Sequence, residues 1–120
     1  MSGDLDPRAQ LVELKARYCR LVDEKDWEAL RALFAPEALF DVPVWSEPKL
    51  RDAAIEAYAR TMADFESVHT VTMPLVEFAG ADTARVDWRM EDRLYRTDPE
   101  SGATVLCHGF GHYADRFRRD

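Results

Sequence analysis

Four side chains that can bind or move protons stand out in the sequence: Tyr18, Asp23, His69 and Asp92. A histidine ring titrates near neutral pH, so His69 can serve as a general base if the fold brings a carboxylate to it. A strand-end histidine satisfied by the backbone or by Thr70 is an equally good interpretation of the residue alone. Tyr18 lies on an apolar helical stripe, where an ordinary core tyrosine is the commoner case.

Both carboxylates occupy unfavourable places. Asp23 falls in the last turn of a predicted helix, where the helix macrodipole disfavours a negative charge by roughly 0.3–1 kcal/mol. Asp92 falls on the apolar face of a predicted strand, where burial of an unpaired carboxylate is costly. We therefore expect each to have a partner or a task. Two alternatives stay open: Asp23 in a solvated turn, and a β-bulge that turns Asp92 toward Arg89 or Arg93.

Side chains that could contact a small molecule come from three further segments. Val42 lies between the second and third predicted helices, Trp88 on the apolar face of the middle predicted strand, and Tyr113 on one face of the last strand. Gly109 and Gly111 share that face with Tyr113 and leave space above the sheet. We expect Val42, Trp88 and Tyr113 to bind the substrate.

Several other chemistries are excluded by the sequence. His108 and His112 are four residues apart on a predicted strand, roughly 13 Å from each other, so they cannot share a metal ion. The chain has no glycine-rich phosphate loop and no nucleophile elbow. Cys19 and Cys107 predict two buried thiols without a disulfide. We expect no metal and no cofactor, which leaves acid–base chemistry.

The first half of the sequence predicts helices. Asp6-Pro7 is a good helix start, because Asp6 can cap free N–H groups and proline suits the first helical position. Asp26 can cap a short second helix that ends at Pro36. Phe40 to Trp45 is typical of a short strand, and Pro48 to about Phe65 of a third helix.

The second half predicts an antiparallel meander. Three long runs, Val68 to Phe78, Thr83 to Arg96 and Ala103 to Arg118, are joined by turn-forming segments at 80–82 and 98–102. Alternation in the middle run assigns one apolar and one charged face. Helices followed by strands indicate an α+β fold, with three N-terminal helices on a curved, mostly antiparallel sheet that encloses a pocket.

Length and charge restrict the class of protein. The chain has 120 residues, 47% of them hydrophobic, which predicts one domain over 1–120. Its net charge is -7, which argues against binding to nucleic acid or anionic membranes. No apolar run approaches the roughly 20 residues of a membrane span. We expect a cytoplasmic protein.

The order of elements and three segments resemble a known family. The segments are Tyr18 to Trp27, Phe34 to Ala38 and Gly109 to Arg119. They resemble the SnoaL-like branch of the cone-shaped superfamily that includes nuclear transport factor 2, scytalone dehydratase, hexachlorocyclohexane dehydrochlorinase and bile acid dehydratase. The resemblance covers nearly the whole chain and specifies no substrate.

The resemblance implies roles for four residues. Asp23 and His69 match the pocket pair in which histidine takes a proton and aspartate orients it. Asp92 and Tyr18 match a second carboxylate and a pocket tyrosine of the bile acid dehydratases. Leu94 stands where scytalone dehydratase has a second catalytic histidine, and Val22 where it has a tyrosine, so the chain is not expected to be a scytalone dehydratase.

The resemblance also implies a homodimer formed through the outer face of the sheet, and a last strand of the relatives is expected to be absent here. One partly apolar row of the final strand would otherwise face water. The row consists of Thr104, Leu106, His108, Phe110 and His112.

Two functional hypotheses follow. The first is a cofactor-independent, dehydratase-like lyase or isomerase that acts on a small apolar or polycyclic metabolite, with His69 as base. The second is a non-catalytic module of the same fold that binds a small ligand or dimerises. The distance between the Asp23 carboxylate and the His69 ring discriminates between them.

Overall fold

Three helices precede the long strands, as the sequence predicts. The structure is a computed structural model that describes residues 6–119. Helix α1 spans Pro7–Glu24, and the Asp6 side chain accepts a hydrogen bond from the Ala9 N–H at its start. Helix α2 spans Trp27–Arg31 and is capped by Asp26. Both predicted caps are therefore present. Capping involves residues that are neighbours in the sequence, so it could be predicted from the sequence.

The connection between α2 and the long strands differs from the prediction. Only Leu39–Phe40 forms a strand, β1, because the chain turns at Pro43 and the Trp45 N–H donates to the Val42 carbonyl. β1 pairs with β2, Lys49–Leu50. Helix α3 consequently begins later than expected and spans Arg51–Met62. Helix α2 also ends before Pro36, at Arg31.

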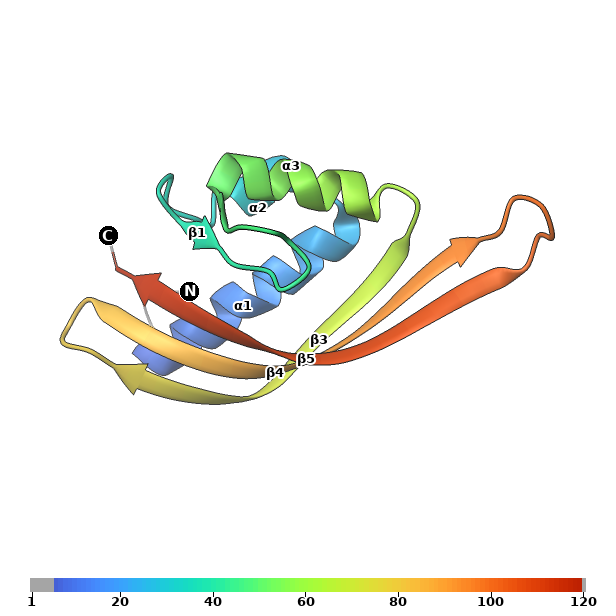
Figure 1. Ribbon diagram of the computed structural model, residues 1–120. Helices are drawn as coiled ribbons and strands as arrows, with labels where there is room; N and C mark the ends of the chain where they lie inside the picture. Colours follow the sequence, from blue (N-terminus) through green and yellow to red (C-terminus); the bar gives the residue numbers. More distant parts are fainter. Residues whose placement is uncertain (1–5, 120) are drawn as a thin grey trace.

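The three predicted long strands form one antiparallel sheet in the order β3-β4-β5. Their bounds are Glu66–Phe78, Thr83–Thr97 and Thr104–Arg118. The helices lie on one side of this curved sheet, and the small β1–β2 hairpin lies near the end of β5 (Figure 1). The architecture is α+β, as predicted, and the helices leave the opposite face of the sheet uncovered.

The register of the sheet sets which side chains share the face beneath the helices, here called the inner face. His69 on β3 pairs with Asp92 on β4, and Asp92 pairs with Gly109 on β5. The irregularity in the sheet lies in β3, between Thr72 and Leu75. It is therefore not at Asp92, and the alternative in which a bulge turns Asp92 outward is wrong.

The core lies between the helices and the middle of the sheet. Val22, Leu30 and Ile55 are buried between the helices, and Val86 and Trp88 are buried on β4. No helix among residues 6–119 is long and apolar enough to cross a membrane. The core thus anchors α1 and β4, the two elements that carry Asp23 and Asp92.

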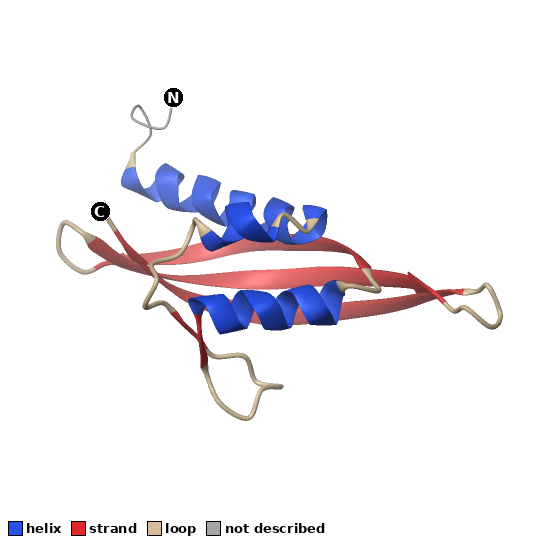
Figure 2. Ribbon diagram, turned by 90° about the horizontal axis from the view of Figure 1, so that it is seen from above, coloured by secondary structure: helices blue, strands red, loops and turns tan. Residues whose placement is uncertain are grey.

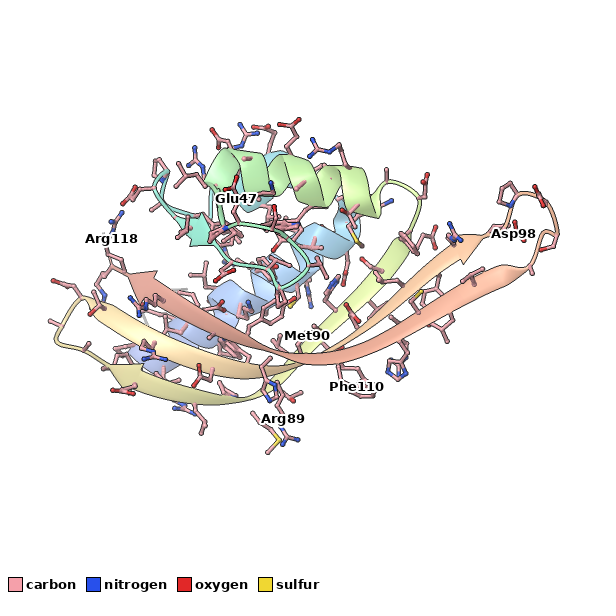
Figure 3. The ribbon with its side chains drawn as sticks, in the orientation of Figure 1. Glu47, Arg89, Met90, Asp98, Phe110 and Arg118 are labelled. Atoms are coloured by element: carbon pink, nitrogen blue, oxygen red, sulfur yellow. The ribbon has the colours of Figure 1, made fainter. Side chains whose placement is uncertain are left out.

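The β4–β5 hairpin extends beyond the helices, so that the molecule measures 54 Å along its longest axis (Figure 2). Asp98 lies at the tip of this hairpin in Figure 3. Cys107 on β5 pairs with Leu94 and is exposed, whereas Cys19 is buried in the core. The expectation of two buried thiols is therefore wrong for Cys107, because it lies in the half of β5 that leads to the hairpin turn at 98–102.

Candidate functional site

The structure brings Asp23 and His69 together across the space between α1 and β3. The His69 Nδ1 atom lies 2.6 Å from the Asp23 Oδ1 atom, within hydrogen-bonding distance. The backbone N–H of His69 donates to Asp23 Oδ2 at 2.9 Å, and the Ser67 hydroxyl donates to Oδ1 at 2.7 Å. The carboxylate is therefore fixed by three hydrogen bonds from one strand.

The end of α1 explains how Asp23 reaches β3. The helix ends at Glu24, and Lys25 adopts the left-handed conformation with φ 59°, so its N–H returns to the Leu21 and Val22 carbonyls. This cap leaves Asp23 in the last helical turn, close to the first residues of β3. The hydrogen bonds from Ser67 and His69 offset the unfavourable position of the carboxylate at the helix terminus.

Asp92 lies on the other side of the His69 ring. Its Oδ2 atom is 3.7 Å from His69 Nε2, which is longer than a hydrogen bond. The side chain of His69 is 10% exposed, and those of Asp23 and Asp92 are 22% and 19% exposed. The group is thus partly shielded and still reachable from solvent.

This geometry defines a state of the His69 ring that suits a base. A carboxylate only accepts hydrogen bonds. When the His69 ring is neutral, its single N–H is therefore assigned to Nδ1, which donates a hydrogen bond to Asp23. Nε2 then carries a lone pair directed toward the side of Asp92. Because Asp92 does not bond Nε2 directly, that lone pair remains available to a bound molecule.

Tyr18 contributes to a second polar cluster on the same side of the sheet. Its hydroxyl lies near those of Tyr58 from α3 and Tyr113 from β5 and interacts with them electrostatically. Burial raises the pKa of Tyr18 well above its usual value of 10.0, and it also raises the pKa of Tyr58 and of Tyr113. The three hydroxyls therefore stay neutral and can donate hydrogen bonds at neutral pH.

Lys15 and Asp115 form an ion pair beneath these tyrosines. The Lys15 Nζ atom lies 2.7 Å from Asp115 Oδ2, 4.2 Å from the centre of the Tyr18 ring and 3.7 Å from that of Tyr113. Burial lowers the pKa of Lys15, and the Asp115 carboxylate opposes this effect. The Lys15 side chain is 5% exposed, and its ammonium group is enclosed by the Asp115 carboxylate and two aromatic rings.

The three expected substrate-binding residues differ in accessibility. Val42 and Tyr113 are half-buried, and Tyr113 packs edge-on against Tyr18. Trp88 is only 2% exposed, and its indole N–H has no hydrogen-bond partner among the described residues. Val42 and Tyr113 are therefore within reach of a ligand, whereas Trp88 lies behind the surface of the inner face.

Aromatic side chains close the space above the tyrosines. Phe40 from β1 and Trp45 from the following loop pack against Tyr58, with ring centres 6.1 Å and 5.6 Å away. Phe34 also contacts Phe40, at 4.7 Å. A separate open groove of about 150 Å³ lies at the other end of α1, and none of the four expected catalytic residues lines it.

Three residues of these clusters were missed by the sequence interpretation. Ser67 shares the inner face with His69 because it lies two residues earlier on the same strand, so alternation could have revealed it. Lys15 interrupts the apolar stripe of α1 one turn before Tyr18, and a charge at such a position signals a buried partner. Tyr58 lies on the side of α3 that packs against the core, where a tyrosine is most often an ordinary core residue.

Nearly the whole chain matches the model of a known family. The SnoaL-like domain matches residues 3–120. The chain belongs to the SnoaL-like domain family. No curated protein matches the sequence of this SnoaL-like protein.

Solved structures with the same fold include proposed dehydratases and a dioxygenase subunit. A proposed dehydratase of the NTF2-like family from Streptomyces avermitilis is 21% identical, with a TM-score of 0.79 over 92% of this chain and 85% of the other. A proposed scytalone dehydratase from Novosphingobium aromaticivorans is 18% identical, with a TM-score of 0.78 over 92% and 72%. The beta subunit of the benzoate 1,2-dioxygenase from Burkholderia mallei is 21% identical, with a TM-score of 0.68 over 92% and 79%. These likenesses establish the fold of the SnoaL-like protein.

Proposed function

We propose that the protein is a cofactor-independent lyase or isomerase that removes a proton from carbon with His69 as the base. The observation that carries this proposal is the Asp23–His69 hydrogen bond of 2.6 Å, which orients a partly shielded ring whose Nε2 atom is unbonded. Proton transfer by a positioned side chain contributes about 10²–10⁴-fold to a rate. The similarity to proposed dehydratases supports the same class of reaction.

In the proposed reaction, the C–H bond next to a carbonyl breaks and its proton moves to His69 Nε2. The electron pair of that bond forms an enolate, whose oxygen accepts hydrogen bonds from Tyr18 and the hydroxyls beside it. In a dehydration, His69 Nε2 gives this proton to a hydroxyl group on the next carbon, which then leaves as water. Asp92 lies beside the His69 ring during this transfer. In an isomerisation, the proton returns to another carbon.

The surroundings of this site favour a small, mostly apolar substrate. Phe40, Trp45 and Tyr58 supply aromatic surface, and Val42 supplies aliphatic surface on the same loop. The tyrosine hydroxyls supply donors for one oxygen atom. A carbonyl compound with one or more rings has both properties.

The experiment uses two bicyclic ketones as probes. With α-tetralone in deuterated water, we expect the purified protein to exchange the hydrogens next to the carbonyl, as followed by NMR. With the β-hydroxy derivative of the same ketone, we expect loss of water and formation of a fluorescent naphthol. His69→Gln and Asp23→Asn should both slow these reactions by about 100-fold or more. Equal rates in the wild type and His69→Gln would contradict the proposal.

A second candidate function is a non-catalytic module, and the likeness to a dioxygenase beta subunit is the observation that favours it. In that case the Asp23–His69 pair would serve stability only. Removing the pair would then lower the melting temperature without changing the binding of tetralone, measured by calorimetry. Binding is retained in both cases, so the turnover assay separates the two functions: only an enzyme loses turnover when the pair is removed.

We also propose that two copies associate through the outer face of the sheet. Leu106 and Phe110 are 53% and 76% exposed there, and Val68 on β3 is 49% exposed. Arg89 and Phe110 point away from the helices (Figure 3). A partner sheet would remove this apolar surface from water. Sedimentation at micromolar concentration should give the mass of a dimer, and a monomer would contradict the proposal.

A further inference from the structure

The four glycines within residues 6–119 fall into two groups with different reasons for their presence. Gly80 and Gly102 have positive φ angles of 79° and 73°, and an added Cβ would meet no atom at either position. They serve turns that other residues adopt with difficulty. Gly109 and Gly111 lie in the extended strand β5, where any residue can adopt the backbone, so their lack of a side chain is the feature that needs an explanation.

The space above Gly109 is occupied by the carboxylate of Asp92. A Cβ at position 109 would overlap Asp92 Oδ1, and it would also lie 3.5 Å from Cγ and 3.9 Å from Oδ2. At Gly111, by contrast, a Cβ would meet only the Cε methyl of Met90, at 3.3 Å. A methionine end can move aside at little cost. Only Gly109 therefore has its missing side chain replaced by a candidate catalytic group.

The cross-strand register explains why this matters for His69. Position 92 has His69 as its neighbour on β3 and Gly109 as its neighbour on β5. The Asp92 carboxylate leans toward β5, over Gly109, and its Oδ2 atom stays 3.7 Å from His69 Nε2. A side chain at position 109 would push the carboxylate back toward β3, where the His69 ring lies.

We infer that Gly109 is a positioning residue that keeps Asp92 at a distance from the His69 ring. With Gly109, Asp92 is near enough to exchange protons through a bound molecule and too far to occupy Nε2 itself. With alanine at this position, Asp92 moves, and its carboxylate either bonds Nε2 or leaves the inner face. The catalytic consequence rests on the proposed function, whereas the positional consequence is independent of it.

The experiment compares Gly109→Ala with the matched control Gly111→Ala, each in the wild-type protein and in Asp92→Ala. Glycine in a strand interior is unfavourable relative to alanine, so a substitution without overlap should stabilise the protein. We expect Gly109→Ala to lower the urea midpoint of unfolding in the wild type and to leave it unchanged or raise it in Asp92→Ala. Gly111→Ala should shift the midpoint by the same amount in both backgrounds.

A second readout reports on the position of Asp92 directly. The ring ¹⁵N resonances of His69, assigned by their loss in His69→Gln, should change in Gly109→Ala and remain unchanged in Gly111→Ala. A merely structural role for Gly109 would leave them unchanged, because the Asp23 side of the ring is not touched. Turnover of the β-hydroxy ketone should fall on the order of 100-fold in Gly109→Ala, since small displacements at a reacting centre have effects of this size.

Each outcome decides the inference. Equal midpoint shifts of Gly109→Ala in both backgrounds, together with unchanged His69 resonances, would overturn it. If Gly109→Ala does not fold, the double variant with Asp92→Ala must fold, and failure of the double variant would overturn the inference as well. If the wild type shows no turnover while the midpoints and resonances behave as expected, the proposed function fails and the positioning role of Gly109 stands.

Discussion

Two carboxylates on the inner face of the sheet, Asp115 and Asp92, have contrasting surroundings. Asp115 forms a direct ion pair of 2.7 Å with Lys15, and the ammonium group is enclosed by the rings of Tyr18 and Tyr113. Asp92 faces the His69 ring at 3.7 Å and makes no direct bond to it. Lys15 and Asp115 bond each other directly and are called here the closed pair. His69 and Asp92 are called the open pair, because their separation leaves room for a bound molecule.

This contrast indicates which polar group stabilises the fold and which is free to react. A buried ion pair whose charges are satisfied contributes little new chemistry, and breaking it is costly. A carboxylate that approaches a histidine without bonding it does little for stability, while it can share a proton with a bound molecule. We therefore expect stability to depend on Lys15 and turnover to depend on Asp92.

The largest effect on stability is predicted for Lys15→Met. Removal of the ammonium group leaves Asp115 without its partner in a mostly buried position, which should cost about 3 kcal/mol of unfolding free energy. Lys15→Met combined with Asp115→Asn should recover most of this loss. Urea denaturation measures both. A single variant as stable as the wild type would remove the distinction between the closed and the open pair.

The next effect is predicted for Asp92→Asn and concerns turnover. The shape of the side chain is kept and a partly buried charge is removed, so stability should be equal to that of the wild type or higher. Turnover should fall by about 100-fold, because the second carboxylate of the site is lost. A thermal melt and a rate on the β-hydroxy ketone test this, and unchanged turnover would leave Asp23 and His69 to carry the reaction alone.

A smaller effect is predicted for the tyrosines in alkaline solution. Burial raises the pKa of Tyr18 above its usual 10.0, so the neutral hydroxyl is favoured in the folded protein. The resulting stability is fully present below pH 10.0 and is lost as the pH rises through the higher folded pKa. The melting temperature should decline above about pH 10 and decline less in Tyr18→Phe. Parallel curves for the two proteins would contradict this prediction.

The smallest effect is predicted for Ser67→Ala. The variant removes one of the three hydrogen bonds to the Asp23 carboxylate and leaves the two from His69. We expect a loss of about 1 kcal/mol in stability and a fall in turnover of less than tenfold. Ser67→Thr retains a hydroxyl and is the matched control. An effect as large as that of Asp23→Asn would mean that Ser67 holds the carboxylate by itself.

The parts of the fold that depend on local chemistry were predictable. Asp6, Pro7 and Asp26 define helix starts through capping, and alternation along β4 defines its inner face. The irregularity in β3 was not predicted, although Pro74 lacks the N–H that a central ladder needs. The same proline follows Met73, whose φ of 51° marks the irregular backbone.

The candidate site was predictable in its members and not in its distances. Periodicity predicted Asp23 at a helix end and Asp92 on the apolar face of a strand, and the resemblance predicted that both share a pocket with His69. The 3.7 Å separation between His69 and Asp92 depends on how the carboxylate leans over Gly109. The burial of Lys15 depends on the packing of α1 against β5. Such separations arise from tertiary contacts, which no local pattern specifies.

The tautomer of the His69 ring tests most directly whether Asp23 prepares His69 as a base. Ring ¹⁵N NMR of the resting protein at slightly alkaline pH, with His69→Gln for assignment, distinguishes the two ring nitrogens. We predict a proton on Nδ1, hydrogen-bonded to Asp23, and an unprotonated Nε2, with this preference weakened in Asp23→Asn. A proton on Nε2 in the neutral ring, or a spectrum that Asp23→Asn does not change, would contradict the proposed role of the pair.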